Sequence, residues 1–189
     1  MLHLALISGT DRPGAKALSI SRYLKKRYEQ EGCVVSLINM QEFPLQAVQG
    51  GKYGQDIPEI QPFIDTILES DGIVMVIPEY NGTYPGILKL FIDYLPFPEA
   101  FSKKPISYIG EAAGAFGGLR AVEQMEQVAS YRYAYNFNER VFINRVHKTF
   151  SEEGGISDDF QQQLLDSQIA NFPVFVQKVK EENLQDSIG

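Results

Sequence analysis

Five apolar residues in a row, Ile73-Val74-Met75-Val76-Ile77, follow Asp71-Gly72 and end abruptly at Pro78. A short run without polar positions is typical of a strand that is buried on both faces, as in the centre of a parallel sheet covered by helices. Four further apolar runs predict neighbouring strands at Leu4–Ser8, Val34–Asn39, Ile106–Ile109 and Val141–Ile143. The run 73–77 therefore constrains the chain to a layered fold with helices on both sides of a sheet.

Helical patterns separate these strands. Apolar residues recur at helical spacing over 20–28, 60–68 and 87–95, a further helix is predicted over 117–130, and the tail from Leu164 to Val176 is predicted to be a helix interrupted at Pro173. Five strands that alternate with helices predict a doubly wound α/β fold with a five-stranded parallel sheet in the order 2-1-3-4-5. A Rossmann order is the main competitor, and it usually requires a sixth strand.

Composition narrows the class of protein. The length of 189 residues suits one domain over 1–189, and the net charge of −7 argues against a nucleic-acid or anionic-membrane surface. The single cysteine, Cys33, excludes an internal disulfide, and His3 and His147 are too far apart in sequence for a local metal motif, so no metal is expected. The apolar start of the chain is too short for a leader, and we expect a cytoplasmic protein.

Ligands of such a sheet bind beyond the carboxyl ends of the strands, at the switch point between strands one and three. The loop there, from Gly9 to Lys16, joins a strand to a helix and contains Thr10 and Arg12. A helix start offers unpaired N–H groups to an anion, and Arg12 and Lys16 add positive charge. A plain strand–helix turn is equally compatible with this loop, which matches neither GxGxxG nor the GxxxxGK[ST] phosphate loop.

Two further loops are unusual. Pro78-Glu79-Tyr80-Asn81 joins the central strand to a helix, and its fixed backbone can present polar groups and an aromatic face to a flat ring, although a rigid turn is the alternative. The segment 110–118 contains four glycines, including Gly114, Gly117 and Gly118, which permit close approach of a ligand to the backbone. Close helix–strand packing explains some of these glycines but not all four.

Together these loops resemble the NADPH-dependent FMN reductase family, which includes quinone, chromate and azo-dye reductases. The resemblance extends from Leu4 to about Val179, and its most specific part is Pro-Glu-Tyr-Asn over 78–81, followed by Pro-Gly-x-Leu-Lys and Ile-Asp-Tyr-Leu up to Leu95. The resemblance implies a flavodoxin-like fold and an enzyme that uses FMN. It further implies hydride transfer from NADPH or NADH to a small electron acceptor in a ping-pong scheme, with no catalytic side chain required.

The resemblance also implies a set of cofactor-binding residues. The phosphate end of FMN is assigned to the first loop, and the ring to the second and third loops. The candidate residues are Gly9, Thr10, Arg12, Lys16, Pro78, Glu79, Tyr80, Asn81, Gly114, Gly117 and Gly118. Glu79 has a second interpretation, which is that it fixes its loop through a hydrogen bond.

Two positions depart from the family pattern. Ala15 and Ala17 stand where the family usually has Ser and Asn side chains in contact with phosphate, and Lys16 is expected to compensate through its charge. An alternative is therefore a flavodoxin-like binding or regulatory protein with weakened or lost FMN binding; a one-electron carrier flavodoxin is a third interpretation. The resemblance also implies a homodimer or homotetramer, with the aromatic stretch 131–137 as a candidate contact.

Overall fold

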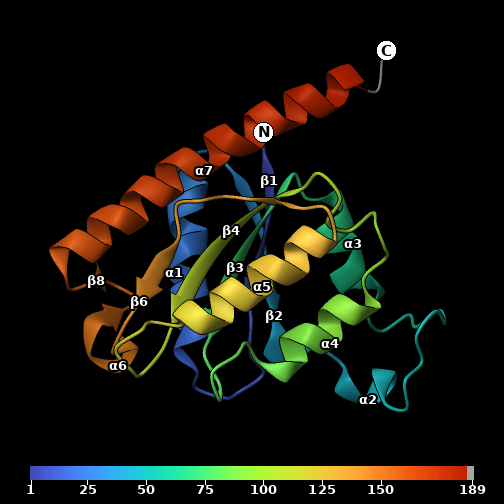
Figure 1. Cartoon of the computed structure of the whole chain (residues 1–189), viewed down its shortest axis with the longest axis horizontal. Helices are drawn as coiled ribbons and strands as arrows, with labels where there is room; N and C mark the ends of the chain where they lie inside the picture. Colours follow the sequence, from blue (N-terminus) through green and yellow to red (C-terminus); the bar gives the residue numbers. More distant parts are fainter. Residues whose placement is uncertain (187–189) are drawn as a thin grey trace.

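A computed structural model describes residues 1–186 as a parallel sheet flanked by helices (Figure 1). The strands run in the order β2-β1-β3-β4-β5, and β6 pairs with β4. They are β1 (His3–Ser8), β2 (Val34–Asn39), β3 (Gly72–Pro78), β4 (Pro105–Glu111), β5 (Tyr135–Asn136) and β6 (Val141–Ile143). All of these pairings are parallel. The predicted order 2-1-3-4-5 and the flavodoxin-like class are confirmed.

The edge beside β4 differs from the predicted single fifth strand. β5 pairs with Pro105–Ile106 at the start of β4, whereas β6 pairs with Ile109–Glu111 at its end. The sheet therefore contains six strands, two of which share the fifth position. The Asn136 side chain helps to hold β5 in place, because its Oδ1 accepts a hydrogen bond of 2.6 Å from the Tyr108 hydroxyl of β4.

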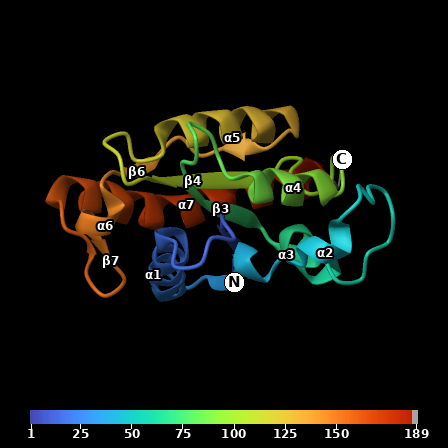
Figure 2. The same cartoon turned by 90° about the horizontal axis from the view of Figure 1, so that it is seen from below.

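Helices cover both faces of the sheet, as predicted. The helical segments are α1 (Lys16–Gln30), the 3-10 turn η1 (Met40–Glu42), α2 (Leu45–Val48), α3 (Gln61–Glu69), α4 (Gly86–Tyr94), α5 (Leu119–Tyr131), α6 (Val146–Thr149) and α7 (Asp159–Asp186). A small antiparallel hairpin, β7 (Phe150–Ser151) with β8 (Gly155–Ile156), precedes α7. Figure 2 shows α1 to the left of the strands and α3 and α4 to the right.

Alternate residues of β1 point into two separate cores. Leu4 and Leu6 pack with α1 and α7, and Ala5 and Ile7 pack with α3, α4 and α5. Every residue of β3 is buried, which confirms the inference drawn from its uninterrupted apolar run. Because helices cover both faces of β3, a ligand can reach this strand only at its ends. The loops that follow the strands are therefore the accessible part of the sheet.

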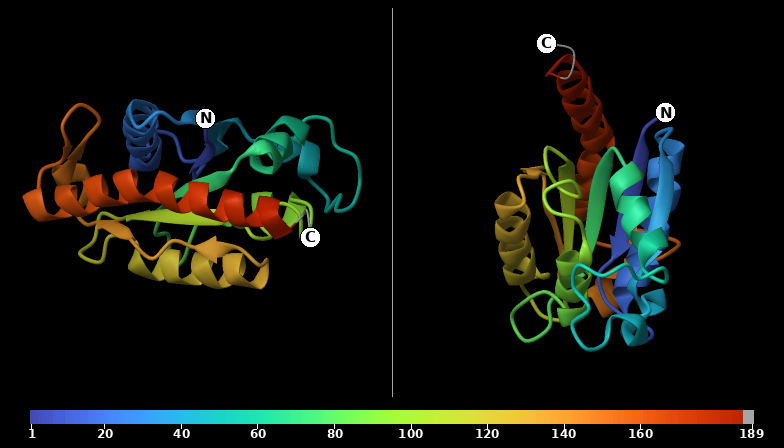
Figure 3. Two further views of the ribbon diagram at one scale, coloured as in Figure 1. Left: turned by 90° about the horizontal axis from the view of Figure 1, so that it is seen from above. Right: turned by 90° about the vertical axis from the view of Figure 1, so that its right-hand side faces the viewer.

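The tail was expected to be interrupted at Pro173, and this prediction is wrong. α7 continues through Pro173, and Figure 3 shows it as one long helix along the sheet. Proline removes one helical N–H and usually kinks a helix. Here the neighbouring residues Ile169, Phe172 and Val176 are fully buried against the core, so packing along the whole helix outweighs the lost hydrogen bond.

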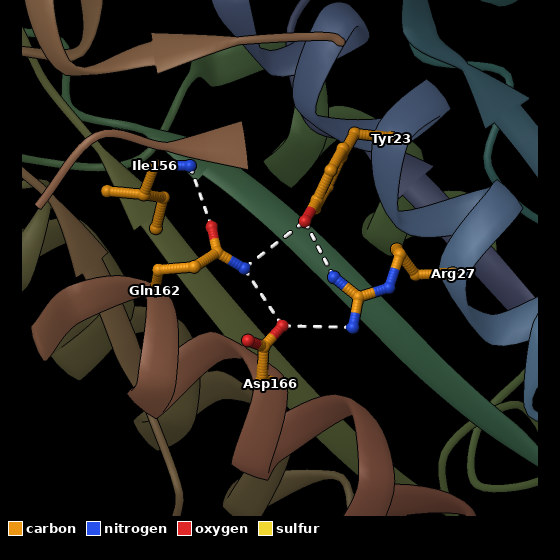
Figure 4. Close-up of polar contacts among 5 residues, drawn as sticks. All are labelled: Tyr23, Arg27, Ile156, Gln162 and Asp166. Atoms are coloured by element: carbon orange, nitrogen blue, oxygen red, sulfur yellow. Dashed lines mark hydrogen bonds and ion pairs between the residues drawn. The ribbon is translucent and has the colours of Figure 1, made fainter. Parts of the chain in front are cut away.

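A polar cluster fastens α7 to α1 (Figure 4). The Arg27 guanidinium donates to the Tyr23 hydroxyl at 2.7 Å and forms a 2.9 Å ion pair with Asp166. Gln162 donates to the same hydroxyl at 3.2 Å and accepts from the Ile156 N–H at 2.7 Å. The cluster thereby joins α1, β8 and the first half of α7.

Candidate functional site

Three loops lie together at the carboxyl end of the sheet. The pairing of Ser8 with Val76, and of Pro78 with Glu111, brings the ends of β1, β3 and β4 to one edge. The loops that follow these strands lie at the lower end of the sheet in Figure 1, and Figure 2 views the molecule from that side. This is the location at which the sequence predicted a ligand.

A cavity of about 200 Å³ lies between these loops. Five of the predicted residues line it, namely Arg12, Lys16, Pro78, Glu79 and Tyr80. Glu111 and His147 also line it, and neither was among the residues predicted to bind the cofactor. Larger hollows on the surface, beside α2 and between α4 and α5, lack this convergence of strand ends. Small-molecule sites usually have volumes of about 300–1,000 Å³, so this cavity suits one end of an extended ligand.

The first loop is held against the sheet by its backbone. The Gly9 N–H donates to the Val76 carbonyl at 2.9 Å, and a Cβ at Gly9 would lie only 2.7 Å from that oxygen, so glycine is required there. α1 then begins without a side-chain cap, because its N-cap residue is Ala15. The first N–H groups of α1 consequently depend on other partners.

A hydroxyl pair joins the first loop to the second. Thr10 is fully buried, and its Oγ1 shares a hydrogen bond of 2.9 Å with the Tyr80 hydroxyl. The same Oγ1 accepts a bond of 3.2 Å from the Arg12 N–H. Thr10 therefore positions both Arg12 and Tyr80, although it does not itself line the cavity.

The second loop is a tight turn. Tyr80 and Thr83 exchange backbone hydrogen bonds of 2.8 and 3.1 Å, and Asn81 and Gly82 occupy the left-handed region with φ of 53° and 79°. The Glu79 N–H donates to the Glu111 carbonyl at 3.1 Å. The N–H groups of Glu79 and Tyr80 are thus used within the protein, and Asn81 lies at the tip of the turn.

α5 supports this turn through side chains. Arg120 donates to Glu79 Oε1 at 2.9 Å, and Gln124 donates to the Gly82 carbonyl at 3.2 Å. The Arg120 guanidinium also lies 5.0 Å from the centre of the Phe116 ring. The Glu79 side chain is only 12 % exposed, and its Oε2 has no hydrogen-bond partner among the described residues. Glu79 therefore fixes its loop, and its second carboxylate oxygen is buried without a hydrogen bond to any residue that the structure describes.

The glycines of the third loop have different environments. Gly117 and Gly118 have positive φ, and a Cβ at either would lie 2.7 Å from backbone atoms of Phe142 or Glu111, respectively. Backbone packing accounts for both glycines, and it also moves the start of α5 from the predicted Gly117 to Leu119. Gly114 has open space around it. Of the three predicted glycines, Gly114 has room to receive a ligand.

Glu111 is the most unusual ionisable group at the site. It ends β4 with only 5 % of its surface exposed, and this burial raises the pKa of its carboxyl to about 7. A hydrogen bond from the Ala17 N–H and the charges of Arg12 and Lys16 oppose the rise only in part. The sequence did carry a signal, because Glu111 is the only ionisable residue between 110 and 118.

A family model for NADPH-dependent FMN reductases matches residues 2–148, which is most of the chain. The chain belongs to the NADPH-dependent FMN reductase family. It is therefore an oxidoreductase whose cofactors are FMN and NAD(P)H, and the resemblance deduced from the sequence is confirmed. The relatives that the chain resembles are named FMN reductases, quinone reductases and azoreductases.

Individual proteins that resemble this chain support the same family assignment. An NAD(P)H-dependent FMN reductase of Pseudomonas aeruginosa is 27 % identical over 158 residues, covering 79 % of this chain and 82 % of its own. A quinone reductase of Escherichia coli K12 is 27 % identical over 190 residues, covering 95 % and 97 %. Among solved structures, the NAD(P)H:acceptor oxidoreductase FerB of Paracoccus denitrificans superposes with a TM-score of 0.76 at 18 % identity, covering 94 % and 98 %. That last likeness supports the fold.

The residues at the cavity suit the ring of FMN and, with one exception, also its phosphate. The orphaned Glu79 Oε2 of the second loop suits a flat ring with N–H donors, and the open space at Gly114 of the third loop leaves room for a ligand. Arg12, Lys16 and the uncapped start of α1 suit an anion. Glu111 is the exception, because its carboxyl lies among these anion-attracting groups.

None of the described helices is both long enough and apolar enough to cross a bilayer.

Proposed function

We propose that this protein transfers hydride from NAD(P)H to small flat acceptors such as quinones, with the donor and the acceptor occupying the same site in turn. The observation that supports this proposal is the convergence of the three loops, joined by the Thr10–Tyr80 hydrogen bond, over a cavity that contains Arg12 and Lys16. When bound, FMN supplies the redox chemistry. The role of the protein is to bind and orient FMN and to shield it from solvent.

In this proposal the first loop holds the phosphate end of FMN. Arg12 and Lys16 neutralise its charge, while the first N–H groups of α1 donate hydrogen bonds. Lys16 acts as a point charge in place of the side-chain donors that Ala15 and Ala17 cannot supply. The cavity between Arg12 and Lys16 is open enough to admit such a group.

The ring lies, in the same proposal, between the second and third loops. Pro78 and the Tyr80–Asn81 turn form one wall, and the backbone at Gly114 forms the other. The Arg120–Glu79 ion pair keeps the first wall in place. No side chain is needed as a nucleophile or general base, because the protein only orients the two reactants at the ring.

The test is an anaerobic titration of FMN-loaded protein. We expect NADPH or NADH to bleach the flavin absorbance, and a quinone added afterwards to restore it. Steady-state rates at several acceptor concentrations should give parallel double-reciprocal lines. Protein that neither binds micromolar FMN nor bleaches with either donor would instead favour the binding or regulatory alternative.

We also propose a cytoplasmic homodimer or homotetramer. The surface near β5 exposes an aromatic group formed by Phe97, Tyr131, Tyr133 and Tyr135, with exposed fractions of 51, 76, 60 and 42 %. Exposed aromatic side chains are typical of protein interfaces. Light scattering on the purified protein measures the oligomeric state, and Tyr131→Ser with Tyr133→Ser should shift it towards monomer.

A further inference from the structure

The carboxyl of Glu111 lies beside basic residues at the start of α1. Glu111 lines the same cavity as Arg12 and Lys16, and the Ala17 N–H in the first turn of α1 donates to it. The N-cap residue, Ala15, supplies no side-chain acceptor of its own. A side chain from the end of β4 thus occupies the helix start that an anionic ligand would use.

The positive charges nearby do not fully compensate this carboxylate. No ion pair joins Glu111 to Arg12 or Lys16 in the part of the chain that the structure describes, so both cations act only from a distance. Because the side chain is 95 % removed from solvent, its desolvation outweighs them, and the pKa rises to about 7. Near neutral pH the carboxyl is therefore divided between its neutral and charged forms.

A phosphate group placed at the start of α1 meets these two forms differently. An ionised Glu111 repels it at close range in a buried setting, where charges are weakly screened. A protonated Glu111 removes the repulsion, and its O–H can donate a hydrogen bond to a phosphate oxygen. The two forms of one side chain thus favour and disfavour the same ligand group.

We propose that Glu111 is a proton-linked specificity residue, which admits the phosphate end of FMN when protonated and rejects it when ionised. The inference rests on the proposed function, in which this end of the cavity holds the phosphate. Above neutral pH, binding of FMN then takes up one proton from solvent, and this proton resides on Glu111. Riboflavin, which lacks the phosphate, binds without this linkage.

Other charged or titratable side chains line the cavity beside Glu111. Arg12 and Lys16 come from the first loop and α1, Glu79 from the second loop, and His147 from α6. Arginine and lysine keep their charge around neutral pH, whereas histidine in general gains charge between about pH 5 and 8. His147 is the imidazole among these groups, and it receives a variant of its own.

The experiment measures dissociation constants of FMN and riboflavin by flavin fluorescence from about pH 6 to about pH 8. The proteins are the wild type, Glu111→Gln and His147→Gln. With a pKa near 7, the protonated fraction falls from about nine tenths to about one tenth, so the wild-type constant for FMN should rise about tenfold. Glu111→Gln should bind FMN at the higher pH about tenfold more tightly than the wild type. His147→Gln should retain the wild-type pH dependence, whatever its affinity at one pH.

The second ionisation of the phosphate itself is common to all three proteins, so the difference between them isolates Glu111. Calorimetry of the wild type in two buffers of different ionisation enthalpy gives an independent measure. Near pH 8 we expect uptake of almost one proton per FMN and none per riboflavin. This second readout does not depend on a variant that folds.

Several outcomes overturn the inference. One is a pH dependence of FMN binding that is the same in Glu111→Gln as in the wild type; another is a dependence that disappears in His147→Gln. A third outcome is that both flavins bind and that the dissociation constant of FMN does not change with pH. This outcome overturns the inference and leaves the proposed function intact. Failure of every protein to bind either flavin at any pH overturns the proposed function itself.

Discussion

Thr10 and Tyr80 are 70 residues apart in sequence, and their hydroxyl oxygens lie 2.9 Å apart in the structure. Thr10 is fully buried, so its oxygen depends on this bond and on the Arg12 N–H. A single side-chain contact thereby sets the distance between the loop with the basic residues and the loop beside the central strand. The two ends of the cavity are coupled through it.

Replacement of Tyr80 by phenylalanine removes this bond and leaves the Thr10 oxygen partly unsatisfied. We expect a loss of about 1 kcal/mol in the free energy of unfolding, and an increase of several-fold in the dissociation constant of FMN. Tyr94→Phe is the matched control, because the Tyr94 hydroxyl donates to the Val48 carbonyl at 3.0 Å, away from the cavity. Urea unfolding and flavin fluorescence measure the two quantities. Equal FMN affinity in both variants would contradict the coupling.

The Glu79–Arg120 ion pair is the second support of the cavity. Arg120→Ala leaves a nearly buried carboxylate without its partner. We expect FMN affinity to fall and the free energy of unfolding to decrease by about 1 kcal/mol. The stability loss stays small because the Arg120 side chain is 53 % exposed and its charge is screened. The measurements are a flavin titration and urea unfolding.

The control for Arg120 uses an ion pair between α5 and the segment before β6. Arg140 lies 2.9 Å from Glu126 of α5, so Arg140→Ala removes an ion pair of equal length that is not part of the second loop. We expect it to reduce stability without changing FMN affinity. The double variant Glu79→Gln with Arg120→Ala should recover part of the stability lost in Arg120→Ala, because no unpaired charge remains.

The raised pKa of Glu111 makes the stability of the protein depend on pH. Its ordinary pKa is 4.5 and its folded value is about 7, so the folded state binds more protons between these values. The free energy of unfolding from this group therefore falls as the pH rises from about 4.5 to about 7, by about 3 kcal/mol in total. Near pH 8, where the folded carboxyl is almost fully ionised, the loss is complete.

Glu111→Gln removes this dependence. We expect the variant to be more stable than the wild type at about pH 8, and to differ little near pH 5. Urea unfolding at several pH values, with the flavin-free protein, gives the difference directly. If the free energies of unfolding of wild type and variant differ by the same amount at every pH from about 5 to about 8, Glu111 titrates as an ordinary exposed glutamate.

Local patterns predicted much of this architecture, and long-range contacts decided the rest. The apolar run at 73–77 and the helical spacing over 60–68 each reflect burial that is written in neighbouring residues. β5 has only two residues, and it exists because Tyr108 and β4 lie beside it. Pro173 lies within a continuous helix because residues on both sides of it pack against the distant core. Such contacts leave no periodic signal in the segment itself.

The candidate site likewise contains residues that local patterns predicted and residues that only long-range contacts reveal. The segment at Pro78 and the basic loop at Arg12 were predicted, because strand ends in a parallel sheet must meet at one edge. Glu111 was missed. It is the only ionisable residue between 110 and 118, but the segment itself does not indicate that its carboxyl faces α1. Its importance arises from the pairing of β3 with β4, which carries the end of β4 to the cavity.

Gly114 and Gly118 offer a test that separates packing from ligand binding within one loop. Gly118 has a φ of 87°, and a Cβ there would lie 2.7 Å from the Glu111 nitrogen. We therefore expect Gly118→Ala to cost about 2 kcal/mol or more in the free energy of unfolding, and FMN binding to weaken with the distorted loop. Thermal unfolding of the flavin-free protein measures the loss.

Gly114→Ala is the informative partner of that variant. No atom lies within 4 Å of a Cβ built at Gly114, so the flavin-free protein should unfold at the wild-type temperature. If the backbone at 114 approaches the flavin ring as proposed, the added methyl group collides with the ligand, and affinity for both FMN and riboflavin falls together. Unchanged affinity for both flavins would place the ring away from the third loop. A loss for FMN alone would instead assign Gly114 to the phosphate end of the cavity.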